Sequence, residues 1–184
     1  MKKFSTRARL RLGVVGIVAA VGATGMTVGA SAEPSPNRSN RLEATFAETR
    51  VSLLDRAADL GIRQVITSGT GSLEGYGAAS ELAAISQDHA VTPCGTGSSS
   101  STILRRIVVP EGTLVIKTLA HRCPAGGGVI IATGEYLVDG ASSTGVFAGA
   151  RGKGTETVHI EPPPSGAITA TISGKLHLVR GSDD

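Results

Sequence analysis

The amino-acid sequence predicts an all-β protein, an antiparallel sandwich or barrel, behind an export leader. Residues 168–178 (ITATISGKLHL) alternate apolar and polar side chains, which is the pattern of a half-buried strand. Several other segments rich in β-branched residues are separated by short turns that contain Gly or Pro. The chain also opens with a segment typical of secretion signals, so the strands belong to an exported product.

Residues 1–32 are predicted to be a signal peptide. Cations precede an apolar run that extends from Leu12 to about Gly29, and Ala30-Ser31-Ala32 is a small-residue cleavage pattern. Glycines interrupt the run and no charge flanks its far side, which favours a cleaved signal over a membrane-spanning anchor. We therefore expect a secreted protein, cleaved near Ala32 and without membrane anchoring.

The charge of the mature chain differs from that of the whole sequence. The leader holds five of the 18 Lys+Arg and none of the 15 Asp+Glu, so the mature chain has a net charge of −2. Its aromatic residues are few and scattered: Phe46, Tyr76, Tyr136 and Phe147. A weakly acidic chain with few rings for base stacking argues against nucleic acid as a partner.

Residues 33–62 are predicted to form a polar tail followed by a short helix. Apolar residues recur at mostly helical spacing between Leu42 and Leu60, Asn40 and Glu43 fit a capping box, and Gly61 fits a helix end. The alternative is a disordered arm that becomes a strand near Val51. The β domain is then expected over residues 63–181.

Strands are expected through the rest of the chain. Residues 102–109 and 112–122 are joined by a turn around Pro110, and residues 128–138 and 152–160 have the same β-branched character. Arg105 and Arg106 are adjacent within a strand, so one of them must point inward or pair at an edge. We favour a structural ion pair over an anion site for this residue.

Cys94 and Cys123 are the only cysteines. In an exported chain an isolated pair indicates a disulfide bond. A redox role would favour CxxC spacing, which is absent. Zinc is the alternative, because His89 and His121 lie near the two cysteines in the sequence.

The stretch TGVFAGARGKGT (144–155) is glycine-rich and contains two cations. It fails as a phosphate-binding loop, because Phe147 stands where the first glycine should be and Gly154 follows the lysine. We expect instead a tight connection between strands, in which Gly145, Gly149 and Gly152 permit unusual backbone geometry and Phe147 is the buried anchor.

The same stretch resembles the TGxFxGAxGxGT signature of secreted bacterial proteins similar to the allene oxide cyclase and dirigent barrels. Residues 69–77 (GTGSLEGYG) and the closing 168–178 segment also look like strands of that superfamily. The resemblance implies an eight-stranded antiparallel barrel with a central cavity, often assembled as a homo-oligomer. It carries over no activity, because the catalytic residues of the plant enzymes find no match here.

No catalytic residue, metal site or cofactor is predicted. Glu74 and Tyr76 lie two apart on an expected strand and share a face, and they are candidate cavity residues together with Tyr136. The alternative is that these side chains face solvent. The histidines are dispersed, and no G-x-S-x-G nucleophile turn is present.

The functional expectation is a non-enzymatic protein that binds a small apolar ligand in its barrel or acts as an extracellular interaction module. One alternative is a cyclase- or dirigent-type enzyme that steers a reactive intermediate inside the barrel. Another is a structural envelope or matrix protein that associates with itself through exposed strands.

Overall fold

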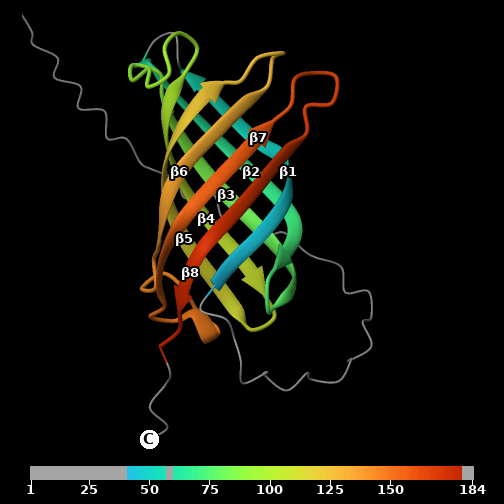
Figure 1. Ribbon diagram of the computed structural model, residues 1–184, viewed down its shortest axis with the longest axis vertical. Coiled ribbons are helices and arrows are strands. Elements are labelled where there is room, and N and C mark those ends of the chain that lie inside the picture. The colour runs from blue at the N-terminus through green and yellow to red at the C-terminus, as the bar shows by residue number, and fades with distance from the viewer. Residues whose placement is uncertain (1–40, 57–59, 180–184) are drawn as a thin grey trace, which may run out of the picture. The chain divides into compact units, whose positions relative to one another are not determined.

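A computed structural model describes residues 41–56 and 60–179, and these form a closed antiparallel β-barrel (Figure 1). The predicted signal peptide and the tail up to residue 40 lie outside the described residues. The strands are β1 (Arg41–Arg56), β2 (Ile62–Leu73), β3 (Gly77–Asp88), β4 (Ser99–Val109), β5 (Gly112–Pro124), β6 (Ile130–Val138), β7 (Arg151–Ile160) and β8 (Ile168–His177).

Each strand pairs with the next one along the chain, and β8 returns to pair with β1. The closing ladder places Ala44 opposite Ile172 and Phe46 opposite Ala170. Closure leaves the body of the sheet without a free edge, which removes a route to aggregation. The predicted eight-stranded antiparallel barrel is therefore confirmed, and so is the turn that joins β4 to β5.

The helix predicted between residues 42 and 60 is wrong, because Arg41–Arg56 is strand β1. Leu42, Ala44 and Phe46 alternate into the interior, and the strand is hydrogen-bonded to β2 and β8. Alanine and glutamate give the segment local helix propensity, but closing the barrel outweighs it. The β domain consequently begins at Arg41 and not at residue 63.

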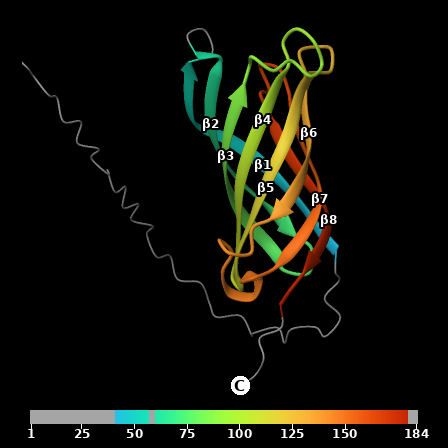
Figure 2. The same ribbon diagram turned by 90° about the vertical axis from the view of Figure 1, so that its left-hand side faces the viewer.

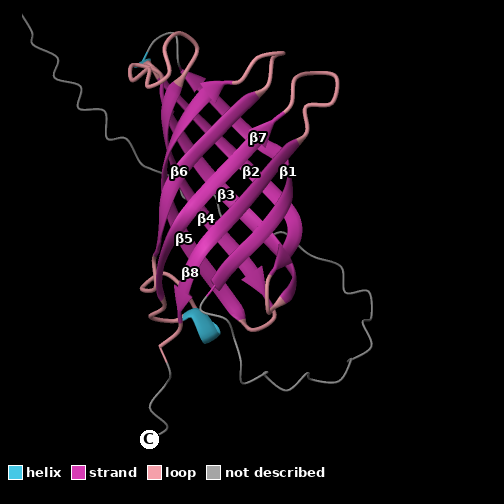
Figure 3. Cartoon of the chain, in the orientation of Figure 1, coloured by secondary structure: helices cyan, strands magenta, loops and turns pink. Residues whose placement is uncertain are grey.

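The barrel has two different ends (Figure 3). One end, which we call the closed end because side chains fill its interior, carries the chain segments 74–76, 110–111 and 139–150. The last of these contains the 3-10 helix η1 (Gly145–Phe147). The open end carries the segments 60–61, 89–98, 125–129 and 161–167. No helix of the described residues is long and apolar enough to cross a membrane.

Strand β1 pairs with β8 only as far as Glu48, and beyond that residue it pairs with β2 alone. An irregularity between Arg50 and Ser52 marks the change of course. Figure 2 shows the far ends of β1 and β2 standing apart from β6 to β8. The open end is thus wider than a fully paired barrel would be.

The closed end is filled by side chains. Phe147 is fully buried and its ring centroid lies 4.8 Å from that of Tyr76. The φ angles of Gly145 and Gly149 are positive, at +60° and +70°. A Cβ at Gly145 would collide with the backbone carbonyl of Glu111, and a Cβ at Gly152 would collide with that of Lys175. The glycines of this corner are therefore required by geometry, and Phe147 fills the closed end as its plug.

The disulfide prediction is also confirmed. Cys94 and Cys123 are bonded, with their Cα atoms 5.7 Å apart. The bond ties the segment between β3 and β4 to the end of β5, at the open end. Because the sulfurs are bonded to each other, they do not serve as zinc ligands.

Candidate functional site

A layer of charged side chains crosses the middle of the barrel. Arg105 of β4 has no exposed surface, and its guanidinium bonds to Glu48 of β1, Glu81 of β3 and Glu156 of β7. Nη1 lies 2.7 Å from Oε1 of Glu48, and Nη2 lies 2.6 Å from Oε1 of Glu156. One cation therefore joins strands from opposite parts of the sheet.

Strand alternation places these groups inside. Arg105 lies between the buried Ile103 and Ile107 on the inward face of β4, and a charge at such a position is tolerated only when it is paired. Gly69 stands between Glu48 and Glu81 in the ladder. A Cβ there would lie 2.7 Å from Oε1 of Glu81, so the glycine leaves room for the two carboxyl groups.

The cluster holds more negative than positive charge, since three carboxyl groups surround one guanidinium. Burial raises the pKa of Glu81 to about 7; Arg105 opposes this rise and the neighbouring Glu48 adds to it. Burial disfavours the charge on Arg105, but attraction by Glu156, Glu48 and Glu81 outweighs it and raises the arginine pKa above its ordinary value. Glu81 is thus the group of this cluster that gains or loses a proton near neutral pH.

The carboxyl oxygens are unequally partnered. Glu156 accepts from Arg105 through one oxygen and from the Thr118 hydroxyl through the other. Oε2 of Glu48 and Oε1 of Glu81 are buried and accept no hydrogen bond from the described residues. Two acceptors therefore retain capacity for a further donor.

A pocket of about 230 Å³ opens beside this layer at the open end of the barrel. Its inner end is formed by Glu48 and Thr67, and Gly128, Pro162 and Pro163 from two open-end loops border it. Its walls are mainly aliphatic, from Val65, Ile85, Ile130, Val158, Ile160 and Ile168. The barrel interior is therefore packed at one end and hollow at the other.

Several buried polar atoms of this pocket have no partner among the described residues. They are Oε2 of Glu48, Oγ1 of Thr67, Oε1 of Gln87 and Nε of Arg122. Native proteins pair almost all such atoms, because an unpaired buried polar group costs about 1–3 kcal/mol. Their concentration around one cavity makes this cavity the candidate binding site.

Three arginines line the outer part of the pocket: Arg50, Arg63 and Arg122. Arg63 donates two hydrogen bonds to Asp55, of 2.9 and 2.6 Å, and Glu161 also lines the rim. The pKa of Arg122 is lowered by burial and then by the charges of Arg63 and Arg50. The rim is therefore positive, in contrast to the carboxylate at the inner end.

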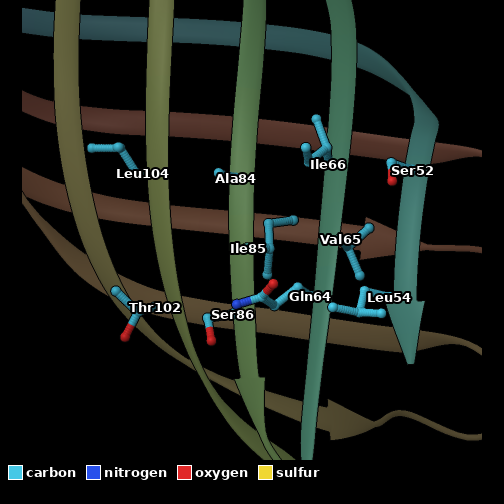
Figure 4. Close-up of a pocket in the computed structure, with 10 residues that line it drawn as sticks. All are labelled: Ser52, Leu54, Gln64, Val65, Ile66, Ala84, Ile85, Ser86, Thr102 and Leu104. Carbon is cyan, nitrogen blue, oxygen red and sulfur yellow. The ribbon is translucent and has the colours of Figure 1, made fainter. Parts of the chain in front are cut away.

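A second hollow, of about 400 Å³, is lined by residues of β1 to β4 (Figure 4). Most of its side chains are exposed, among them Leu54, Ile66 and Leu104, and none of its lining residues is charged. An uncharged, exposed hollow offers contact area but no acid, base or ion partner. We call it the outer groove.

The residues predicted from the sequence as cavity groups lie elsewhere. Glu74 is exposed in the turn between β2 and β3, and Tyr76 is half-buried against Phe147 at the closed end. Tyr136 is fully buried, its hydroxyl has no partner among the described residues, and burial raises its pKa to about 12. None of these three lines the open-end pocket.

The residues that line the pocket were not predicted from the sequence. Of the charged layer, an ion-paired arginine was expected at position 105 or 106, and it is Arg105. Glu81 was detectable, because it alternates in phase with Ala79 and Ala83 on one face of its strand. Glu48 was hidden by the helix prediction over its segment. Comparison of the chain with protein-family models, with curated proteins and with solved structures found no match.

Proposed function

We propose that this chain is a secreted barrel protein that binds a small, largely apolar molecule in its open-end pocket. The observation that carries the proposal is the cavity itself, which has aliphatic walls and buried polar atoms that lack partners. A few placed polar groups in an apolar cavity are the usual composition of a ligand site.

The size of the pocket limits the ligand. Sites for drug-sized molecules usually measure about 300–1,000 Å³, and this pocket is smaller at about 230 Å³. The packed closed end, with Phe147 as its plug, leaves no reason to expect a channel through the barrel. A molecule of roughly amino-acid size is the best fit.

The proposal includes export and kinship. Secretion with cleavage near Ala32 is supported by the leader sequence, and a disulfide bond is typical of exported proteins. The barrel and the Phe147 corner support distant membership of the allene oxide cyclase and dirigent superfamily. Fold kinship alone does not imply an activity, so binding rests on the pocket.

Native mass spectrometry of protein produced from the full-length chain tests this function. We expect a small molecule to remain bound and to be lost in Ile160→Trp, because the indole would fill the pocket. Thr169→Trp, on the exposed outer face of the neighbouring strand, is the matched control and should retain the molecule. A wild-type protein that carries nothing and takes up no small molecule from a cell extract would refute the proposal.

A second candidate function is proton transfer to or from the bound molecule. It is favoured by Glu81, whose pKa of about 7 suits general acid–base catalysis near neutral pH. Glu81 does not line the pocket, but it shares Arg105 with Glu48, whose unpartnered oxygen lies in the pocket. This candidate predicts that the recovered molecule is chemically altered by the wild-type protein and unaltered by Glu81→Gln. Recovery of the same unaltered molecule from both proteins would exclude it.

A further inference from the structure

The open-end pocket is electrically polarised along its depth. Along β1, Glu48 lies deeper in the barrel than Arg50, and along β2, Thr67 lies deeper than Arg63. Thr67 is directly opposite Arg50 in the ladder, so it lies between the inner carboxylate and the rim. Arg122, near the end of β5, adds a third cation to the outer part. Negative charge therefore lies at the inner end of the pocket and positive charge at its rim.

The unpartnered atoms include an acceptor at the inner end, Oε2 of Glu48, and Oγ1 of Thr67 at the level of Arg50. Oε1 of Gln87 is a further acceptor on the wall, and Gln87 is opposite Arg63 in the ladder of β2 and β3. Glu48, Thr67 and Gln87 are only 7, 2 and 6 % exposed. Nε of Arg122, in the outer part, is an unpartnered donor. A matching ligand therefore offers a donor to Glu48 at its inner end and an acceptor to Arg122 at its outer end.

The charge of the middle layer specifies the kind of donor. Arg105 is the one cation shared by the carboxyl groups of Glu48, Glu81 and Glu156, so acidic groups outnumber basic groups in the layer. A cationic donor beside Glu48 would neutralise part of that excess and form a charge-assisted hydrogen bond. A second anion at this depth would be repelled, which disfavours a carboxylate entering first.

We propose that the pocket binds a small zwitterion with an aliphatic body, its ammonium group on Glu48 and Thr67 and its anionic group at Arg122. A primary ammonium group carries three N–H donors, which suits a site rich in acceptors. The aliphatic walls between the two charged regions accommodate the body of the molecule. This assignment rests on the proposed function and specifies its ligand class.

Calorimetric titration with probes of one carbon skeleton tests the assignment. The probes are 6-aminohexanoic acid, hexylamine, hexanoic acid and 1-hexanol, each added to the full-length protein at the same ionic strength. We expect 6-aminohexanoic acid to bind tightest, hexylamine next, and both to bind more tightly than 1-hexanol. This order of affinities distinguishes a site that binds an ammonium group from a site that binds only the apolar part of the probe.

Variants assign each end of the ligand. Glu48→Gln keeps an acceptor for Arg105 and should weaken hexylamine binding roughly tenfold or more, since a bond to a charged group is lost. Thr67→Val removes an acceptor without changing charge and should weaken it by about three- to tenfold. Arg122→Met should weaken hexanoic and 6-aminohexanoic acid but not hexylamine. Glu135→Gln, on the exposed outer face of β6, is the control and should change nothing.

Three results would overturn the assignment: no binding of any probe at millimolar concentration, hexylamine binding no tighter than 1-hexanol, or an unchanged hexylamine affinity in both Glu48→Gln and Thr67→Val. A co-purified molecule that Ile160→Trp excludes would in each case still support the proposed function. A wild-type protein that also carries no bound molecule would refute both the ligand assignment and the proposed function. The two failures are therefore distinguishable.

Discussion

The closed and open halves of the barrel hold different kinds of side chain at their inward-facing positions. At the closed end these positions hold Leu73, Leu114 and Leu176, and Phe147 fills the remaining space. Toward the open end they hold Glu48, Thr67 and Gln87, whose polar atoms are buried and incompletely paired. Both halves belong to the same strands, so the difference lies in side chains and not in topology.

This contrast separates stability from function. Buried apolar side chains stabilise a fold roughly in proportion to the area removed from water, whereas an unpaired buried polar atom costs free energy. The unpaired polar atoms of the open half are explained by a ligand that forms hydrogen bonds with them. We accordingly assign stability to the closed half and binding to the open half, with Arg105 at the boundary.

The largest effect is expected at that boundary. Arg105→Met leaves the carboxyl groups of Glu48, Glu81 and Glu156 buried without their cation, which should cost about 3–5 kcal/mol of unfolding free energy or prevent folding at neutral pH. Urea unfolding measures the loss. Because protonation removes the uncompensated charge, the variant should recover stability at pH 5 relative to pH 8.

Arg106→Met, exposed on the outer face, should change stability by less than about 0.5 kcal/mol. Similar small losses in both variants would contradict a charged layer inside the barrel.

The closed half should depend on its plug. Phe147→Ala removes a fully buried ring that contacts Tyr76 and should cost about 3–5 kcal/mol. Val146→Ala, at the more exposed neighbouring position, should cost much less. If ligand binding were lost in Phe147→Ala protein that is still folded, the proposed separation of the two halves would be wrong.

The disulfide should stabilise the open end in particular. Replacing Cys94 and Cys123 together by serine removes a cross-link over 29 residues, and the chain-entropy model gives a loss of about 3 kcal/mol. Hydrogen exchange should show the largest loss of protection in the segment between β3 and β4 and at the end of β5. Equal loss of protection around η1 would show that the two ends are not independent.

The smallest effect is expected from pH. The pKa of Glu81 is raised from 4.5 to about 7, so the folded state keeps its proton longer than the unfolded state as pH rises. The resulting stability is fully present below pH 4.5, decreases as pH rises toward 7, and is absent above that value. Thermal unfolding midpoints should therefore fall across this range in the wild type and fall less in Glu81→Gln. Glu74→Gln, at an exposed position, should preserve the wild-type slope; a slope unchanged in Glu81→Gln would show that another group is responsible.

Much of the fold was predictable because its signals are local. The alternation of residues 168–178 and the turn before Gly112 each depend on a short stretch of chain, and each was confirmed. The Phe147 corner is equally local, and Phe147 is buried there. Strand β1 was not predictable in this way. Its pairing with β8 joins residues more than a hundred positions apart, and its alanines and glutamates favour a helix when read locally.

The site was less predictable than the fold. One of Arg105 and Arg106 was expected to point inward or pair at an edge, because two adjacent residues in a strand face opposite sides, and Arg105 is the inward one. Its three partners lie on β1, β3 and β7, which only the closed barrel brings together. Tyr136 was a candidate cavity residue with a solvent-facing alternative. It is buried but does not line the open-end pocket, since strand periodicity gives the face of a residue and not its neighbours.

A chemical-shift titration of ¹⁵N-labelled protein with 6-aminohexanoic acid tests whether the open-end pocket binds the ligand. We expect saturable shifts at the amides of Thr67, Gln87 and Arg122, and little change at Phe147 and Leu176 of the closed end. Shifts centred on the outer groove, at Leu54, Ile66 and Leu104, would contradict this expectation and assign the contact surface to the outside of the barrel.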